Sequence, residues 1–228
     1  MPKITHIIYD FDGLLLDTEP IHHQVNSRIA ASYGKTFTSE VHSKIIGRTA
    51  LDSAQLIVEM LGLPLTPVDY LKERDNIIYD LYPEAQPMPG AMALTQHLQQ
   101  HHIPQAIATS SSVKSFQGKT VNYQDWLKLF ACIVLGDDAE IKQGKPAPDS
   151  FLVTAKRLDA NPSQCLVFED SLAGVTAAKE AGMFVVAIPA KEMNRSDFAI
   201  ADEVLDSLLQ FEPSRWDLPA FTPSQQMG

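Results

Sequence analysis

Short runs of apolar, β-branched residues recur along the chain and predict the strands of a sheet. They are THIIYD (5–10), IPQAIATS (103–110), ACIVLGDD (131–138), QCLVFED (164–170), MFVVAIP (183–189) and DEVL (202–205). Helical patterns separate the later runs, namely ALTQHLQQH, DSFLVTAKRL and SLAGVTAAKEAG. Strands that alternate with helices are typical of a parallel α/β sheet.

One interval breaks this alternation. Between about residue 17 and about residue 87 the patterns are helical, and the Pro-rich segment PEAQPMPG closes the interval. We therefore predict a discontinuous core, residues 1–16 and 88–228, with an all-helical cap domain inserted over residues 17–87. The C-terminal segment 211–228 is Pro-rich and lacks periodicity, so we expect a loosely packed tail.

The composition is that of an ordinary soluble globular protein. Hydrophobic residues make up 45% of the 228 positions and charged residues 20%, and no apolar run approaches the ~18 residues of a membrane span. The first residues lack the basic start and long apolar middle of a signal peptide. Cys132 and Cys165 each lie in an apolar run, which favours buried thiols. We therefore expect a cytoplasmic protein without a membrane partner.

The net charge limits the partners. At −10 it disfavours nucleic acid, because phosphate backbones are bound mainly through clustered Lys and Arg. A small anionic substrate would need a local positive group to overcome the general field.

Two carboxylates follow the first predicted strand. Asp10 and Asp12 are two residues apart on an extended segment, so both side chains point to the same side. At ~4 Å their repulsion is about 1 kcal/mol in water and about 4 kcal/mol at an effective dielectric of 20. A divalent cation or a raised pKa would offset it, and the pair could then serve as nucleophile and acid. The alternative is a simple Asp12-Gly13 turn.

Hydroxyls and a lysine follow the next two strands. Thr109 and Ser110, with Ser111 and Ser112, could form an anion cradle at a helix start. Helix N-capping is the better explanation for this patch taken alone. Lys145, between Gly and Pro in QGKPAPDSF, could neutralise a phosphate or a developing charge.

Two further acids follow the strand CLVFED. Adjacent oxygen ligands such as Glu169 and Asp170 fit Mg²⁺, although helix capping by Asp170 or Ser171 explains this segment equally well. Ligands bind at the carboxyl ends of strands in open α/β sheets. Acids, hydroxyls, a lysine and more acids at successive strand ends together predict a Mg²⁺ and phosphate site.

These motifs resemble those of the haloacid dehalogenase-like phosphohydrolases along the whole chain. The corresponding segments are DFDGLLLDTEP, ATSS, GKPAPD and VFEDSLAG. The resemblance implies a Rossmann-like parallel-sheet core with an inserted helical cap, and a phosphatase that acts on a small phosphorylated metabolite. We expect the protein to be a monomer or weak dimer.

The resemblance assigns roles to the motif residues. Asp10 would be the nucleophile that forms an aspartyl-phosphate, and Asp12 the general acid and base. Thr109, Ser110 and Lys145 would hold the phosphoryl group.

The same resemblance implies Mg²⁺ as the cofactor. Asp10, the backbone carbonyl of Asp12, and Asp170 would hold the metal. Glu169 would adjoin it or bind it through water.

Substrate choice is expected from the cap. Several local runs, among them ATSS with the later SF and KT, are most similar to phosphatases of pseudouridine 5′-phosphate within the family. His22 and Arg48 are the cap residues expected to contact the substrate, with Arg48 on a polar or anionic leaving group.

Other functions remain open. A sugar-phosphate mutase resembling β-phosphoglucomutase is the main alternative, because such mutases also carry a histidine at the position of His22. A haloacid dehalogenase is a weaker alternative, since its reaction needs neither Asp12 nor the metal ligands. A non-catalytic binding module is the weakest, because Asp10, Asp12, Lys145 and Asp170 are all present.

Overall fold

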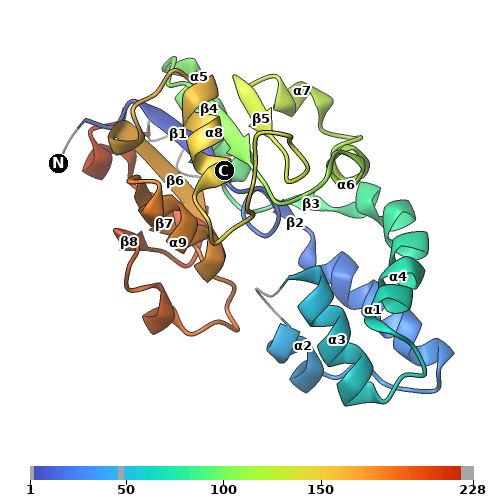
Figure 1. The fold of residues 1–228 in the computed structure, drawn as a ribbon. Helices are drawn as coiled ribbons and strands as arrows, with labels where there is room; N and C mark the ends of the chain where they lie inside the picture. The colour runs from blue at the N-terminus through green and yellow to red at the C-terminus, as the bar shows by residue number, and fades with distance from the viewer. Residues whose placement is uncertain (1–2, 46–48, 222–228) are drawn as a thin grey trace.

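A computed structural model describes residues 3–45 and 49–221 of the chain, and a six-stranded parallel sheet forms its core (Figure 1). The strand order is β5-β4-β1-β6-β7-β8, and every neighbouring pair is parallel. The strands are His6–Tyr9 (β1), Gln105–Ala108 (β4), Cys132–Val134 (β5), Cys165–Glu169 (β6), Phe184–Ala187 (β7) and Glu203–Val204 (β8). Each lies within a run that the sequence predicted, so the parallel α/β core is confirmed.

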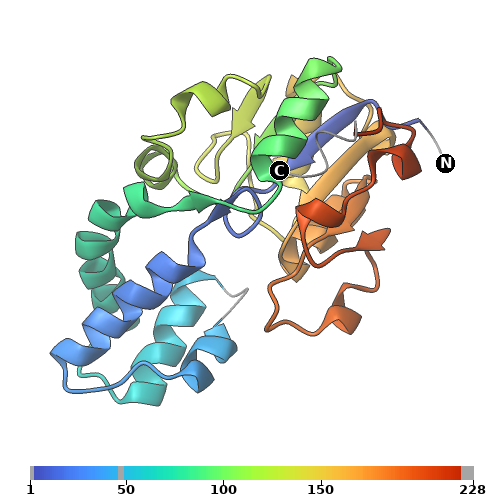
Figure 2. The same cartoon turned by 180° about the vertical axis from the view of Figure 1, so that it is seen from behind.

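Helices cover both faces of the sheet, and the side chains of β1 contribute to the apolar packing on both faces. Ile7 and Tyr9 join one apolar cluster and Ile8 joins another, because successive side chains on a strand point to opposite faces. Helix α5 (Ala91–Gln100) covers the face seen in Figure 2. The other face, seen in Figure 1, carries α8 (Asp149–Arg157) and α9 (Leu172–Glu180).

The first four helices form a separate unit, which we call the helical unit. They are Glu19–Ser32 (α1), Ser39–Ile45 (α2), Ala50–Leu61 (α3) and Pro67–Leu81 (α4). Helix α4 packs on α1 and α3, and α2 packs on α3. The hydroxyls of Thr49 and Thr66 cap α3 and α4 by accepting backbone N–H bonds, and Gly62 ends α3 in the left-handed conformation.

The chain enters and leaves the helical unit through a pair of short strands. These are β2 (Leu16–Asp17) and β3 (Gln86–Pro87), which pair antiparallel with Leu16 opposite Pro87. The backbone N–H of Met88 also donates to the carbonyl of Leu15 at 2.9 Å. The sequence predicted domain boundaries at these places but not the pairing of the two segments.

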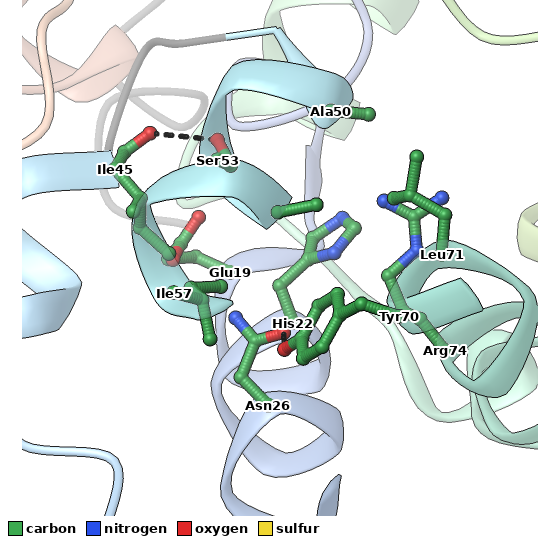
Figure 3. Close-up of a pocket in the computed structure, with 11 residues that line it drawn as sticks. Glu19, His22, Asn26, Ile45, Ala50, Ser53, Ile57, Tyr70, Leu71 and Arg74 are labelled. Carbon is green, nitrogen blue, oxygen red and sulfur yellow. Dashed lines mark hydrogen bonds between the residues drawn. The ribbon is translucent and has the colours of Figure 1, made fainter. Parts of the chain in front are cut away.

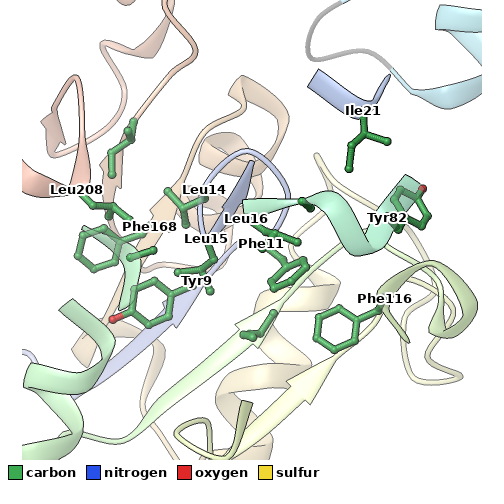
Figure 4. Close-up of a cluster of buried hydrophobic side chains, with 14 of the residues drawn as sticks. Tyr9, Phe11, Leu14, Leu15, Leu16, Ile21, Tyr82, Phe116, Phe168 and Leu208 are labelled. Carbon is green, nitrogen blue, oxygen red and sulfur yellow. The ribbon is translucent and has the colours of Figure 1, made fainter. Parts of the chain in front are cut away.

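A continuous apolar cluster joins the sheet to these connections (Figure 4). Tyr9 stacks on Phe168 with ring centroids 5.3 Å apart, and Phe11 packs against Phe116 at 4.8 Å. Leu14, Leu15 and Leu16, which follow directly, are fully buried. Burial of one such leucine contributes about 1.5–3 kcal/mol, so the segment that leads out of β1 is firmly anchored.

The remaining elements are short. They are the helices Val113–Lys119 (α6) and Gln124–Leu127 (α7), and the 3₁₀ helices Tyr82–Glu84 (η1), Pro162–Gln164 (η2), Arg195–Phe198 (η3), Leu208–Gln210 (η4) and Pro213–Trp216 (η5). In the described ranges, no helix combines the length and apolar character needed to cross a bilayer.

The expected loose tail is wrong for its described part. Phe211, Trp216 and Leu218 are buried, and the indole N–H of Trp216 donates to Glu203 at 2.8 Å. His97 Nε2 lies 2.8 Å from the carbonyl of Pro219. Scattered aromatic residues anchor this segment without any periodic pattern, which is why periodicity did not reveal it.

Candidate active site

A pocket of about 540 Å³ opens at the carboxyl ends of β1, β4 and β6 and extends to the start of the helical unit. It brings together most of the predicted site residues: Asp10, Asp12, His22, Thr109, Ser110, Lys145 and Asp170. Glu169 does not line it, and Arg48 lies outside the described residues. The carboxyl edge of the sheet is therefore where the motifs meet.

The backbone after β1 turns sharply to present both aspartates. The N–H of Asp10 still pairs with the carbonyl of Phe168 at 2.9 Å. Gly13 then adopts φ +80° and donates to the carbonyl of Leu16 at 2.9 Å. A Cβ at Gly13 would collide with the Asp170 carboxylate. Glycine is required there by its positive φ and by the close approach of Asp170.

Lys145 lies between two carboxylates. Its ammonium donates to Asp10 Oδ1 at 2.5 Å, to Glu169 Oε1 at 2.6 Å and to the carbonyl of Ala108 at 3.1 Å. Burial would lower the pKa of Lys145, but the two carboxylates outweigh it and raise the pKa above the ordinary value. Lys145 is thus a fixed positive charge, and each of its three N–H groups has a hydrogen-bond acceptor.

Glu169 contacts Lys145 but does not line the pocket. Its side chain is fully buried, with Oε1 bonded to Lys145 and Oε2 accepting from the N–H and hydroxyl of Ser171 at 3.1 and 3.0 Å. A Cβ at Gly174 would collide with this carboxylate. Both oxygens are engaged behind the pocket, so Glu169 orients Lys145 and the start of α9, and Asp170 is the acid that faces the cavity.

Asp10 and Asp170 repel each other. Burial raises the pKa of Asp10 to about 7, with Lys145 opposing the shift and Glu169 adding to it. Burial also raises the pKa of Asp170, and the charges of Asp10 and Glu169 raise it further. Lys145 alone does not offset the negative charge of this edge.

This excess of negative charge fits a divalent cation. Mg²⁺ takes one or two carboxylates together with waters, a carbonyl and substrate phosphate oxygens. Asp10 and Asp170 line the pocket beside the backbone of Asp12. In the described ranges, at this site or at any other, no three His, Cys, Asp or Glu side chains are grouped so that they could hold a metal ion by themselves. The donors therefore suit a metal that also binds its substrate, rather than a closed structural site.

The carboxylate of Asp12 is held away from Asp10 by other partners. Oδ1 accepts from Lys119 at 2.6 Å and Oδ2 accepts from the Ser111 hydroxyl at 2.7 Å. Burial would raise the pKa of Asp12, but the charge and hydrogen bond of Lys119 and the bond from Ser111 lower it below its ordinary value. The acids of the DFD motif thus have opposite environments, Asp10 with a raised pKa and Asp12 with a lowered one.

The sequence analysis missed this contact of Lys119. The available clue was periodicity, because Phe116, Lys119 and Thr120 are all buried on one side of α6. A lysine on an otherwise buried helix stripe needs an anionic partner.

The residues of the hydroxyl patch differ in what they do: one caps a helix, and others line the pocket, where an anion could bind. Ser112 caps α6 by accepting from the backbone N–H of Ser115 at 3.4 Å. Thr109 is buried and accepts from the N–H of Ser111 at 3.0 Å, and with Ser110 it lines the pocket. A Cβ at Gly136 would collide with the Ser110 backbone, so this glycine lets two loops approach.

A second, smaller pocket of about 230 Å³ lies inside the helical unit (Figure 3). Glu19, His22 and Ala50 line both pockets, so the two adjoin. Its other polar lining comes from Asn26, Ser53, Tyr70 and Arg74. The hydroxyl of Tyr70 donates to Asn26 Oδ1 at 2.8 Å, and Ser53 donates to the carbonyl of Ile45 at 3.3 Å. None of these lining residues except His22 was predicted.

His22 lies between the two pockets. Burial lowers its pKa to about 4, with the nearby charge of Lys119 lowering it further and that of Asp12 opposing. At neutral pH the imidazole is therefore uncharged and presents one donor and one acceptor.

The sequence matches known proteins over most of its length. Residues 7–188 match the haloacid dehalogenase-like hydrolases. (DL)-glycerol-3-phosphatase 1, mitochondrial, of Arabidopsis thaliana is 43% identical over 227 residues, which cover 97% of this chain and 76% of that protein. The probable pseudouridine-5′-phosphatase of Drosophila melanogaster is 41% identical over 223 residues, covering 96% of each.

Solved structures share the whole arrangement. A putative β-phosphoglucomutase from Thermotoga maritima has a TM-score of 0.75 at 29% identity, covering 89% of this chain and 94% of that one. CbbY from Rhodobacter sphaeroides in complex with phosphate has a TM-score of 0.73 at 26% identity, covering 91% of this chain and 96% of that one. Each match takes in about nine tenths of this chain, so it includes parts of both the sheet and the helical unit.

Proposed function

The chain belongs to the haloacid dehalogenase-like hydrolases and is a phosphoric monoester hydrolase, and from this premise we propose how it works and on what. It is a Mg²⁺-dependent phosphatase that passes through an aspartyl-phosphate, with residues 17–87 acting as the cap. One observation carries this mechanism: Asp10 lies beside Lys145 and Asp170 at the pocket, while Asp12 is held separately by Lys119 and Ser111.

The first step transfers the phosphoryl group to Asp10. A carboxylate oxygen of Asp10 attacks phosphorus, the new O–P bond forms, and the bond from phosphorus to the ester oxygen breaks. Asp12 enters this step in its protonated form and gives the proton to the leaving oxygen, which departs as an alcohol. The carboxylate that results is the form that Lys119 and Ser111 stabilise. Thr109 and Ser110 would hold the phosphoryl oxygens and Lys145 would supply a fixed positive charge beside them, since all three line the pocket with Asp10.

The second step releases phosphate. The Asp12 carboxylate, left ionised by the first step, takes a proton from water, whose oxygen attacks phosphorus. The bond between Asp10 and phosphorus then breaks, which returns the Asp10 carboxylate and frees inorganic phosphate. Asp10, Asp170 and the backbone carbonyl of Asp12 would hold Mg²⁺, which supplies charge neutralisation for the phosphoryl group when bound.

The two adjoining pockets support a small polar leaving group. Asp10 and His22 line the same pocket, and that pocket adjoins the polar lining of the helical unit, so the rest of an ester bound at Asp10 would have this lining within reach. Hydroxyls of a polyol, sugar or nucleoside fit donors and acceptors of this kind. The relatives named for glycerol 3-phosphate and pseudouridine 5′-phosphate support this class, and we propose that the substrate is one of its members.

A phosphate-release screen tests the proposal. The panel contains glycerol 3-phosphate, pseudouridine 5′-phosphate, sugar phosphates, nucleotides, flavin mononucleotide and p-nitrophenyl phosphate, each with Mg²⁺ and with a chelator. We expect Mg²⁺-dependent turnover that falls at least ~10³-fold in Asp10→Asn. Asp159→Asn, which removes the same charge at an exposed position, should retain full activity. Absence of turnover across the panel would refute the proposal.

A mutase is the second candidate, and His22 together with the β-phosphoglucomutase neighbour favours it. A mutase returns the phosphoryl group from Asp10 to a second hydroxyl of the sugar, so it must exclude water. Isomerisation of β-glucose 1-phosphate faster than phosphate release would establish the mutase and overturn the phosphatase.

The cysteines support a reducing compartment such as the cytoplasm. Cys132 is half-buried and Cys165 buried, both are free, and burial raises the pKa of each thiol above its ordinary value. Protonated thiols are poor nucleophiles. We also propose a monomer or weak dimer, because exposed apolar residues such as Leu51, Val121 and Ile200 come from separate segments.

A further inference from the structure

Lys119 is a buried cation that lies outside all four sequence motifs. Its side chain is 4% exposed, and its ammonium donates to Asp12 Oδ1 at 2.6 Å and to the Ser111 hydroxyl at 2.8 Å. Ser111 in turn donates to Asp12 Oδ2 at 2.7 Å. These three side chains close a ring of hydrogen bonds in which both oxygens of Asp12 are fixed.

The end of the helical unit holds Lys119 in its place. The ammonium lies 4.9 Å from the centroid of the Tyr82 ring, a cation–π distance. Tyr82 is the first residue after α4, and its hydroxyl accepts from Ser115 at 3.2 Å. Gly118 faces the same ring, and a Cβ there would approach it to 3.1 Å. The position of Lys119 thus depends on where α4 ends.

A structural role does not account for this lysine. A buried ion pair contributes little net stability, because desolvation of both charges offsets their attraction, and an apolar side chain of similar volume often serves as well. A direct role in substrate binding does not account for it either, since Lys119 lines neither the active-site pocket nor the pocket of the helical unit. What Lys119 contacts on the side of the chemistry is Asp12.

We propose that Lys119 is a positioning residue for Asp12. It holds the carboxyl group in the orientation from which a proton reaches the leaving oxygen, and Tyr82 links that orientation to the end of α4. The inference rests on the proposed function, in which Asp12 is the acid.

The test compares phosphate esters whose leaving groups differ in basicity. Protonation by an acid matters most for basic leaving oxygens, and a well-placed general acid contributes about 10²–10⁴-fold. In Lys119→Met, kcat/KM should fall about 10²-fold for phenyl phosphate and less than ~10-fold for p-nitrophenyl phosphate. Lys119→Arg should restore most of the loss. Lys114→Met, which removes an exposed lysine from the same helix, should change neither value.

The alternatives give different results. An equal loss for both esters, or a higher KM with unchanged kcat, would overturn the positioning role. If Lys119→Met does not fold, Tyr82→Leu takes its place, and it should show a smaller selective loss for phenyl phosphate; an unselective effect would refute the inference. A wild-type enzyme that hydrolyses neither these esters nor any member of the panel refutes the proposed function itself, whereas normal turnover without selectivity in the variants refutes only the role of Lys119.

Discussion

The carboxyl ends of the parallel strands, called the sheet edge here, line one pocket, and the interior of the helical unit lines another. The polar side chains of the two pockets differ in how they are hydrogen-bonded. At the sheet edge Lys145 has three partners, and both oxygens of Glu169 are engaged. In the helical unit the polar lining consists of isolated pairs, such as Tyr70 with Asn26. A network with several bonds per group keeps a fixed geometry, whereas isolated pairs can be exchanged singly. On the proposed function, the chemistry and the choice of substrate therefore differ in their tolerance to substitution.

Removal of the central charge of the sheet edge should give the largest effect. Lys145→Met leaves Asp10 and Glu169 buried without a cation, so the free energy of unfolding should fall by about 3–5 kcal/mol. The phosphoryl group also loses a fixed positive charge, and kcat/KM should fall about 10²–10³-fold. Chemical denaturation and phosphate release below the melting temperature measure the two effects.

The control is Lys142→Met, on the same loop but exposed. It should leave stability and turnover unchanged. Near-normal stability in Lys145→Met would show that the network is not tightly coupled, and the contrast between the two pockets would lose its basis.

An intermediate effect is expected where the two pockets meet. Ala50 lines both, so Ala50→Phe should obstruct the passage between them. For a substrate that extends into the helical unit, such as pseudouridine 5′-phosphate, kcat/KM should fall about 10–100-fold. Acetyl phosphate, which is short enough to stay at the sheet edge, should be hydrolysed at the unchanged rate.

The adjacent substitution Leu51→Phe provides the matched comparison, because Leu51 is exposed and lines neither pocket. It should affect neither substrate. Equal losses on acetyl phosphate and on the longer substrate in Ala50→Phe would mean that the two regions cannot be separated.

A third effect concerns the pH dependence of stability at His22. Its folded pKa of about 4 lies below the ordinary value of 6.5, so between these values the unfolded chain binds a proton that the folded chain does not. The free energy of unfolding should therefore be full above pH 6.5 and fall as the pH drops toward 4, by at most about 3 kcal/mol. His22→Gln should flatten this slope in denaturation curves at pH 7 and 4.5.

The exposed His101 serves as the control, since His101→Gln should keep the slope of the wild type. An unchanged slope in His22→Gln would mean that another group takes up the proton on unfolding. A neutral His22 would then no longer distinguish the two pockets.

The sequence revealed the sheet edge far better than the helical unit, for physical reasons. Strand runs such as HIIY are buried on both faces and therefore continuous in apolar residues, and parallel strands bring their carboxyl ends together. Asp10, Thr109, Lys145 and Asp170 could be placed from this rule alone. The pocket of the helical unit has no such rule, because Asn26, Tyr70 and Arg74 meet only through the packing of α1 on α4.

Glu169 and Lys119 show a second limit. Adjacent acids in a sequence look equivalent as metal ligands, yet the alternation along β6 buries Glu169 behind Lys145 and leaves Asp170 facing the cavity. Lys119 contacts a residue 107 positions earlier in the chain. Periodicity hints that Lys119 is buried, but the partners of Lys119 and Glu169 do not follow from local pattern, because each depends on which side of an element faces a distant one.

The antiparallel pairing of β2 with β3 has an evolutionary consequence. Leu16 and Pro87 are opposite each other, so the chain leaves the sheet and returns to it at neighbouring points. A segment whose ends lie side by side can be lengthened, shortened or exchanged without altering the order of the strands around it. Substrate preference could thus diversify by replacement of one contiguous stretch of gene, while the residues that break the phosphate ester stayed in their original register.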